Sequence, residues 1–311
     1  MNRICKAMLC LAGGVMFLAA SATSTFAMGN GTGEIDYEGG VVRAQGMGIA
    51  PAKAVNMAQA RIMARRAAVV DGWRQLAETV KGVDIDSETT LEMNMVQSDV
   101  VRSKMSASIK GARVVEEHME ADGAYVVTME VPMFGVSGSV AAAAMPKPEV
   151  KESFPQPVAD VAPAAPVTQT VHVDVTVNTQ TPAPAAPVKG SSAAAAPSGK
   201  AIGGFTGLIV DCRGMGLKPV MSPVIKNANG QPIYGYKNLD YDGVIANGMA
   251  GYTSDMSRGV SRAGSHPLLV KAVSLDNHNG NPVLSVADAN RVLIENGATG
   301  FLDKTNVVFV R

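Results

Sequence analysis

A proline-rich stretch, residues 137–200, most constrains what this chain can fold into. It carries ten prolines among many alanines, and such a composition cannot bury enough apolar surface to form a core. We therefore predict a long disordered linker there. It leaves one folded domain over residues 34–136 and a second over residues 201–311, each about the size of a small independent domain.

Residues 1–27 have the organisation of a secretory signal peptide. Arg3 and Lys6 precede an apolar run that ends in a short polar segment, and we predict cleavage between Ala27 and Met28. The apolar run is shorter than the ~20 residues that a spanning helix needs, which argues against the alternative of a retained membrane anchor. We expect an exported protein of the periplasm or outer cell envelope, without a transmembrane span in the mature chain.

Removal of this peptide changes the cysteine and charge balance of the chain. Cys212 becomes the only thiol of the sequence, so no internal disulfide is expected. Two of the 27 basic residues are also removed, which leaves 25 against 27 acidic residues and a net charge of −2. This balance gives no basic surface of the kind that binds nucleic acid, and we expect no nucleic-acid partner.

The first domain is organised around an amphipathic helix predicted for residues 51–82. Pro51 suits a first helical turn, and Gly82 suits the position after a helix end. The helix has an apolar stripe, made of Val55, Ala58, Ile62, Val69, Trp73, Leu76 and Val80. Small residues would let it lie close to a sheet; they are Ala54, Ala58, Ala60, Ala64 and Ala68.

The rest of this domain alternates between helical and strand patterns. A strand is predicted for residues 40–46 and a second helix for residues 91–109. Two β-rich runs, residues 112–119 and 125–133, flank Asp122-Gly123, which is a strong hairpin signal. The prediction is a β-α-α-β-β unit, a small sheet with its helices on one face.

Several short segments of this domain carry a family resemblance. They are Gly46–Gly48, Ala64–Ala68, Gly82–Ser87, Gly111–Val115 and Asp122–Tyr125. The domain resembles the LPP-twenty lipoprotein-like domain, which is similar to the amino-terminal part of the flagellar assembly protein T. It departs from the lipoprotein members in lacking an acceptor cysteine. The resemblance implies an envelope protein with a structural or interaction role.

The second domain mixes strands with a short helix. Strands are predicted at residues 207–211, 268–273, 283–286 and 305–310, and a helix at residues 287–296. A hairpin around Asn229-Gly230 is also predicted. The fold class is α+β, with two small two-layer α/β sandwich-like domains. This half resembles uncharacterised exported bacterial proteins, a resemblance that implies no activity.

Two glycine-rich motifs and one acidic loop do not fit the sites that they suggest. Gly46-Met-Gly48 and Gly214-Met-Gly216 each lack the third glycine of a dinucleotide-binding turn. Residues 238–243 resemble the first half of a calcium loop, but Met249 stands where a bidentate glutamate is required. We interpret these segments as strand exits and a polar turn.

No metal, cofactor or catalytic constellation is predicted. No two histidines stand at metal-ligand spacing; they are His118, His172, His266 and His278. Cys212 lacks the surroundings of a catalytic cysteine, so we interpret it as a small buried hydrophobic residue. Asp211 and Arg213 flank it and form the only charged pair beside a glycine turn, and they are our candidates for ligand contact.

Alternating valines in the linker form a further candidate element. Residues 171–177 have the period of a half-buried strand, which would add to an exposed sheet edge. A solvated extended segment is the alternative.

Two functional hypotheses remain open, and neither fixes the oligomeric state. The first is a non-enzymatic cell-envelope protein, a structural or assembly factor whose partners are envelope or flagellar proteins. The second is a periplasmic ligand-binding or hydrolytic protein with its site in the carboxyl-terminal domain.

Overall fold

A computed structural model describes residues 33–158 and 199–311, except residue 258. We refer to residues 33–158 as the amino-terminal module and to residues 199–311 as the carboxyl-terminal module. The predicted signal peptide with its cleavage site, and the strand predicted at residues 171–177, lie outside the described residues.

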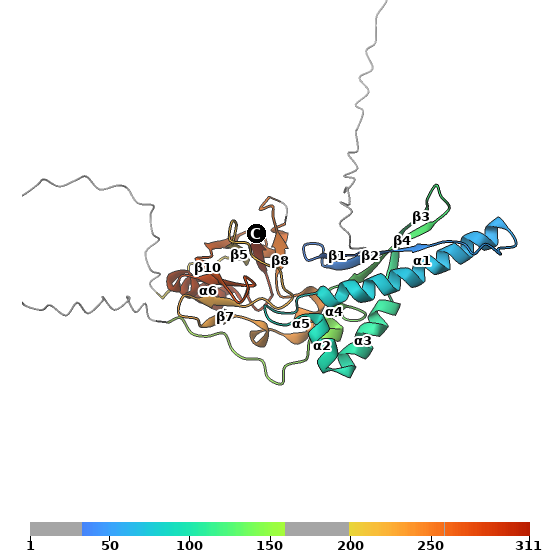
Figure 1. Ribbon diagram of the computed structural model, residues 1–311. Coiled ribbons are helices and arrows are strands. Elements are labelled where there is room, and N and C mark those ends of the chain that lie inside the picture. Colours follow the sequence, from blue (N-terminus) through green and yellow to red (C-terminus); the bar gives the residue numbers. More distant parts are fainter. Residues whose placement is uncertain (1–32, 159–198, 258) are drawn as a thin grey trace, which may run out of the picture. The chain divides into compact units, whose positions relative to one another are not determined.

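The amino-terminal module is built on a four-stranded antiparallel sheet (Figure 1). Its order is β1 (Gly33–Asp36), β2 (Val41–Gly48), β4 (Tyr125–Pro132) and β3 (Arg113–Met119). The long helix α1 (Met57–Thr79) packs on β2 and β4. It is followed by η1 (Val80–Gly82), α2 (Leu91–Gln97) and α3 (Asp99–Lys110). The predicted hairpin formed by β3 and β4 is confirmed, whereas β1 was not predicted.

Small residues hold α1 against the sheet. Ala64, Ala68 and Gly72 are buried on the inner face of the helix. On β2, Gly46 and Gly48 lie so close to the helix backbone that a side chain at either position would collide with it. The predicted close packing of the helix on the sheet is therefore confirmed. The contact requires glycines on the strand as well as alanines on the helix.

The predicted start of this helix is wrong, and so are the first three of the seven positions of its apolar stripe. The helix begins at Met57, because the Asn56 side chain caps it by accepting a hydrogen bond from the Gln59 amide. Val55 and Ile62 are exposed, while Leu76 and Val80 at the other end are buried. The sheet ends at Gly48, so the first turns of α1 have nothing beneath them.

The second predicted helix is interrupted. Ser98 ends α2 and caps α3, accepting a hydrogen bond from the Val101 amide. The break turns α3, so that Met105 is buried while Val96 and Val100 stay exposed.

The carboxyl-terminal module contains two four-stranded sheets. The first is wholly parallel, with the order β8 (Gly251–Thr253), β12 (Val307–Val310), β5 (Gly207–Asp211) and β9 (Pro267–Lys271). The second has the order β10 (Ser274–Asp276), β11 (Asn281–Leu284), β6 (Ile225–Asn227) and β7 (Pro232–Tyr234). The helical segments are η2 (Tyr236–Asn238), α5 (Tyr241–Asn247), η3 (Ser261–Ala263) and α6 (Val286–Thr299).

This mixture of helices and strands confirms the α+β class. The hairpin predicted around Asn229-Gly230 is formed by β6 and β7. The loop that resembles a calcium site is a polar turn, in which Asp240 caps α5 by accepting a hydrogen bond from the Gly243 amide.

The prediction of a linker is wrong for residues 137–158. Helix α4 (Val140–Ala144) forms there, and four of its five residues are buried: Val140, Ala141, Ala143 and Ala144. Further along, the Phe154 ring stacks on Tyr234 with 6.5 Å between the centroids. The alanine-rich composition did not predict this packing. Alanine contributes little apolar area, but it fits a closely packed site.

The two modules meet through backbone hydrogen bonds and shared apolar packing. The Gly135 amide donates to the Ile245 carbonyl at 2.8 Å, and the Met221 amide donates to the Asp84 carbonyl at 2.9 Å. Buried residues of both modules belong to one apolar cluster. The contacts of the described residues therefore group both modules in one compact unit.

Both described ends of the chain beside residues 159–198 attach to α6. Asn290 exchanges two hydrogen bonds with the Val158 backbone, at 2.9 and 2.7 Å. Five residues later, the buried Glu295 carboxylate accepts hydrogen bonds from the Ile202 and Gly203 amides at 2.9 and 2.8 Å. At 1.5 Å per residue, the two anchoring side chains start ~7.5 Å apart along the helix axis.

Candidate functional site

Asp211 and Arg213, the predicted ligand contacts, lie together at the end of β5. The Asp211 carboxylate accepts hydrogen bonds from Arg213 Nε at 2.9 Å and Nη2 at 2.7 Å. This bidentate pairing lowers the pKa of Asp211 and raises that of Arg213. The two side chains satisfy one another, and their contact with a ligand remains a prediction.

The parallel sheet places further polar groups at the carboxyl ends of its strands. Lys271 ends β9 and also lowers the pKa of Asp211 through its charge. Thr253 ends β8, and its hydroxyl donates to the Glu38 carboxylate of the amino-terminal module at 3.1 Å. Ligands of open parallel sheets bind at this edge. The sequence alone did not identify these residues, because strand order depends on contacts between distant segments.

Cys212 is buried, as predicted. Burial raises the pKa of its thiol to about 12, and the neighbouring Asp211 carboxylate adds to the shift. The thiolate is the nucleophilic form of cysteine, so this side chain stays protonated and unreactive at neutral pH.

Within the described residues, no group of three or more histidine, cysteine, aspartate or glutamate side chains is placed to hold a metal ion. The same part of the chain has no helix with the length and apolarity needed to cross a membrane.

A groove of about 610 Å³ lies where the two modules meet. Its lining mixes polar and apolar side chains and includes Glu88 from the loop before α2, Glu152 from the segment after α4, and Tyr236, Lys237 and Asn277 from the carboxyl-terminal module. The Glu152 amide donates a hydrogen bond to the Lys237 carbonyl at 2.8 Å, and the side chains of these two residues form an ion pair at 3.7 Å. The sequence did not predict this groove, because its walls come from three separate parts of the chain.

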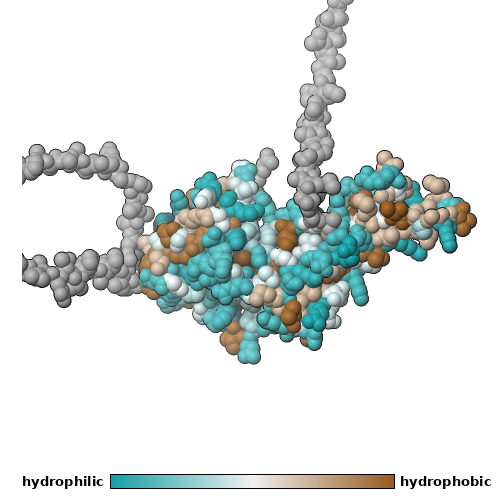
Figure 2. Space-filling model, in the orientation of Figure 1, coloured by the Kyte–Doolittle hydropathy of each residue, from teal (hydrophilic) through white to brown (hydrophobic). Residues whose placement is uncertain are grey.

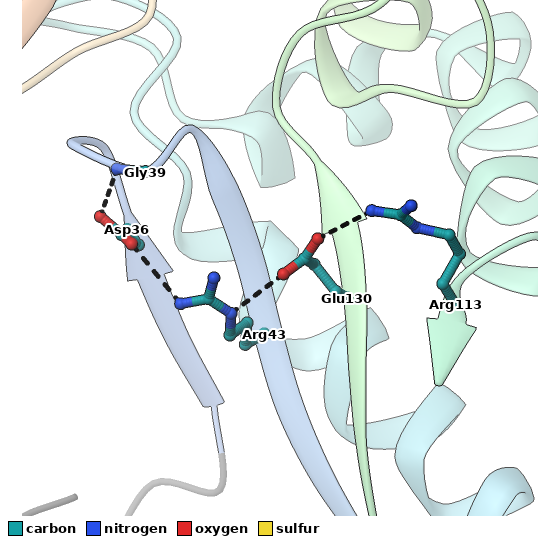
Figure 3. Close-up of polar contacts among 5 residues, drawn as sticks. All are labelled: Asp36, Gly39, Arg43, Arg113 and Glu130. Atoms are coloured by element: carbon teal, nitrogen blue, oxygen red, sulfur yellow. Dashed lines mark hydrogen bonds and ion pairs between the residues drawn. The ribbon is translucent and has the colours of Figure 1, made fainter. Parts of the chain in front are cut away.

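A row of alternating charges crosses the outer face of the amino-terminal sheet (Figure 3). Arg43 on β2 lies 3.5 Å from Asp36 on β1 and 3.0 Å from Glu130 on β4. Glu130 also pairs with Arg113 on β3 at 3.1 Å. The row joins all four strands, and Glu130 at its centre is buried.

An exposed apolar surface lies where β2 turns into α1. We call residues 49–63 the projection, because the sheet ends at Gly48 and no residue of this segment is buried. Ile49 is 72% exposed, and Val55 and Met57 are each 84% exposed. Apolar side chains gather at this end of α1 in Figure 2. The sequence named Val55 and Ile62 as apolar positions but placed them in the core.

Two comparisons identify similar families. Residues 42–131 match the LPP20 lipoprotein family, which confirms the resemblance drawn from the sequence. Residues 207–311 match the family of the second domain of Treponema pallidum Tp0624. A comparison with curated proteins gave no match. The similarity of its amino-terminal module to the LPP20 lipoprotein family indicates that this chain is an exported or envelope-associated protein.

Proposed function

We propose that this protein is a non-enzymatic structural or assembly factor of the cell envelope. One observation carries the proposal, the exposed apolar projection. The projection gathers Ile49, Val55 and Met57 in solvent at one end of α1, and such a concentration of exposed apolar side chains is typical of a contact surface.

Site-directed capture tests this proposal. The exported protein would be cross-linked in intact cells and recovered from envelope fractions, alongside an Ile49→Glu, Val55→Glu variant. We expect the wild-type chain to recover partners that the variant loses. An identical set of cross-linked components from both proteins would contradict a contact surface at the projection.

The partner class that we propose first is the flagellar apparatus, on the strength of the resemblance to the flagellar assembly protein T. The test is co-sedimentation with purified flagellar basal bodies. Sedimentation with basal bodies supports a flagellar role. If the protein is absent from them but is recovered with other envelope proteins, the flagellar role is wrong and the assembly role remains.

Ligand binding is the second candidate function, and the groove favours it. Its lining combines the Tyr236 ring with carboxylates and amides, groups that suit a polar small molecule. Native mass spectrometry of the protein purified from envelope extracts would detect such a ligand. Retention of one molecule by the wild-type chain, and its loss from a Glu88→Gln, Lys237→Ala variant, would favour this function over the first.

A further inference from the structure

We propose that the projection binds the surface of a membrane that carries anionic headgroups. This inference rests on the proposed function, because it names the partner of the same exposed surface. Its support comes from the charge of the projection, from its apolar side chains and from their common position beyond the end of the sheet.

The charge of this region has one sign. The projection contains Lys53 and Arg61 and no aspartate or glutamate, and Arg65 and Arg66 follow it on α1 before Asp71. Arg65 is paired with Glu117 at 2.7 Å. The described residues show no ion pair for the other three cations, Lys53, Arg61 and Arg66, and all three are exposed. The first turn of α1 also carries no acidic side chain, so the partial positive charge of the helix end adds to theirs.

The adjoining β3–β4 hairpin carries the acidic residues Glu116, Glu117, Glu120 and Asp122, and among the described residues only Glu117 pairs with a cation of α1. Glu117 holds Arg65, and Glu120 lies 3.0 Å from the His118 ring. Asp122 accepts a hydrogen bond from the Ala124 amide within the turn. The three unpaired cations of the helix side therefore remain available for an external anion.

The apolar side chains lie among these cations. Val55 and Met57 flank the helix start, close in sequence to Lys53, and Ile62 and Met63 follow Arg61 directly. None of these four apolar residues is buried. Apolar side chains beside long basic ones suit the boundary between headgroups and acyl chains, because arginine and lysine can extend their charged ends to the phosphates.

The one-sign charge favours a membrane over a protein partner. A protein interface normally excludes charge from its apolar centre and places it at the rim. Here the basic residues alternate along the chain with the apolar ones, so that one anionic surface would contact both kinds of side chain. Phosphate headgroups supply the matching negative charge whether they belong to phospholipid or to another lipid of the envelope.

Vesicle flotation tests this inference with the full mature chain. The protein would be mixed with vesicles of phosphatidylcholine alone or with added phosphatidylglycerol, and floated at low and high salt. We expect flotation with the phosphatidylglycerol vesicles and its loss at high salt, because salt screens the attraction. Absence of flotation, or equal flotation with both vesicle types, would overturn the proposal.

Matched variants locate the contact. Val55→Glu with Met57→Glu should reduce the bound fraction about tenfold, and Lys53→Gln with Arg61→Gln should reduce binding to the anionic vesicles by a similar factor. The control is Val96→Glu on α2, where the native side chain is 73% exposed but lies outside the projection. Equal loss in the control would overturn the assignment to the projection. Urea unfolding midpoints would establish that all variants are folded.

The outcomes separate this inference from the proposed function. If the chain binds neither vesicle type but position 55 still cross-links to an envelope protein in cells, the proposed membrane contact is wrong and the assembly role stands. If it binds vesicles but cross-links to no protein, the membrane contact stands and the role in assembling proteins is wrong.

Discussion

Gly48 of β2 lies directly against Ala64 of α1, with no room for a side chain between strand and helix. Gly46 has the same relationship with the backbone of Ala68 and Gly72. This contact fixes where α1 leaves the sheet, and so it determines which part of the helix becomes the projection.

Gly46→Ala is therefore expected to destabilise the fold. A Cβ at this position would meet helix backbone, which cannot move aside as a flexible side chain can, so the free energy of unfolding should fall by about 1–3 kcal/mol or more. Urea denaturation measures the change. Gly82→Ala is the control, because a Cβ there would lie at an ordinary 3.6 Å from Ile35 Cδ1. Equal effects would argue against close packing at residue 46.

The charge row across the sheet gives a second prediction. Glu130→Ala removes the group that joins Arg43 to Arg113 (Figure 3), and its loss at a buried position should cost about 1–3 kcal/mol. Arg74→Ala, which breaks an exposed pair with Asp71 on α1, should change stability by less than about 1 kcal/mol. Chemical denaturation of both variants would make the comparison. If Glu130→Ala leaves the free energy of unfolding unchanged, the charge row does not contribute to stability.

The attachment of both chain ends to α6 predicts that residues 159–198 can be replaced. Exchange for a Gly/Ser segment of about ten residues shortens the loop fourfold, which should raise the free energy of unfolding by about 1 kcal/mol through loop-closure entropy. One cooperative unfolding transition is expected. Two separate transitions in calorimetry would mean that the modules are independent bodies joined by a tether.

The raised pKa of the buried Cys212 thiol predicts that the fold loses stability at alkaline pH. Burial raises the pKa of its thiol from 9.0 to about 12, so the unfolded chain ionises first as the pH rises. This contribution to stability is complete below pH 9 and is lost as the pH approaches 12. Iodoacetamide should modify the native thiol slowly at pH 8 and rapidly in urea. Equal rates in both conditions would contradict a buried thiol.

Local patterns identified much of this fold, and distant contacts limited the rest. The Asp122-Gly123 turn located the β3–β4 hairpin, because turn chemistry acts within a few residues. The stripe of α1 was correct at Leu76 and Val80 but wrong at Val55, because a helix period cannot tell where the opposing sheet ends.

The candidate site was predicted less completely for the same reason. The pairing of Asp211 with Arg213 is local and was anticipated. Lys271 reaches the same edge only because β9 pairs with β5 in parallel, and the groove requires both modules and the segment around Glu152. The proline content of the segment around Glu152 predicted an extended chain. It could not predict which residues that extended chain packs against.

The central claim is that the projection is a contact surface in the envelope. Its most direct test places a photo-crosslinking amino acid at position 55 or at position 96 of the exported chain in living cells. Both native valines are largely exposed, at 84% and 73%. We predict adducts with envelope components from position 55 and few or none from position 96. Equal yields from the two positions, or none from position 55, would contradict the account.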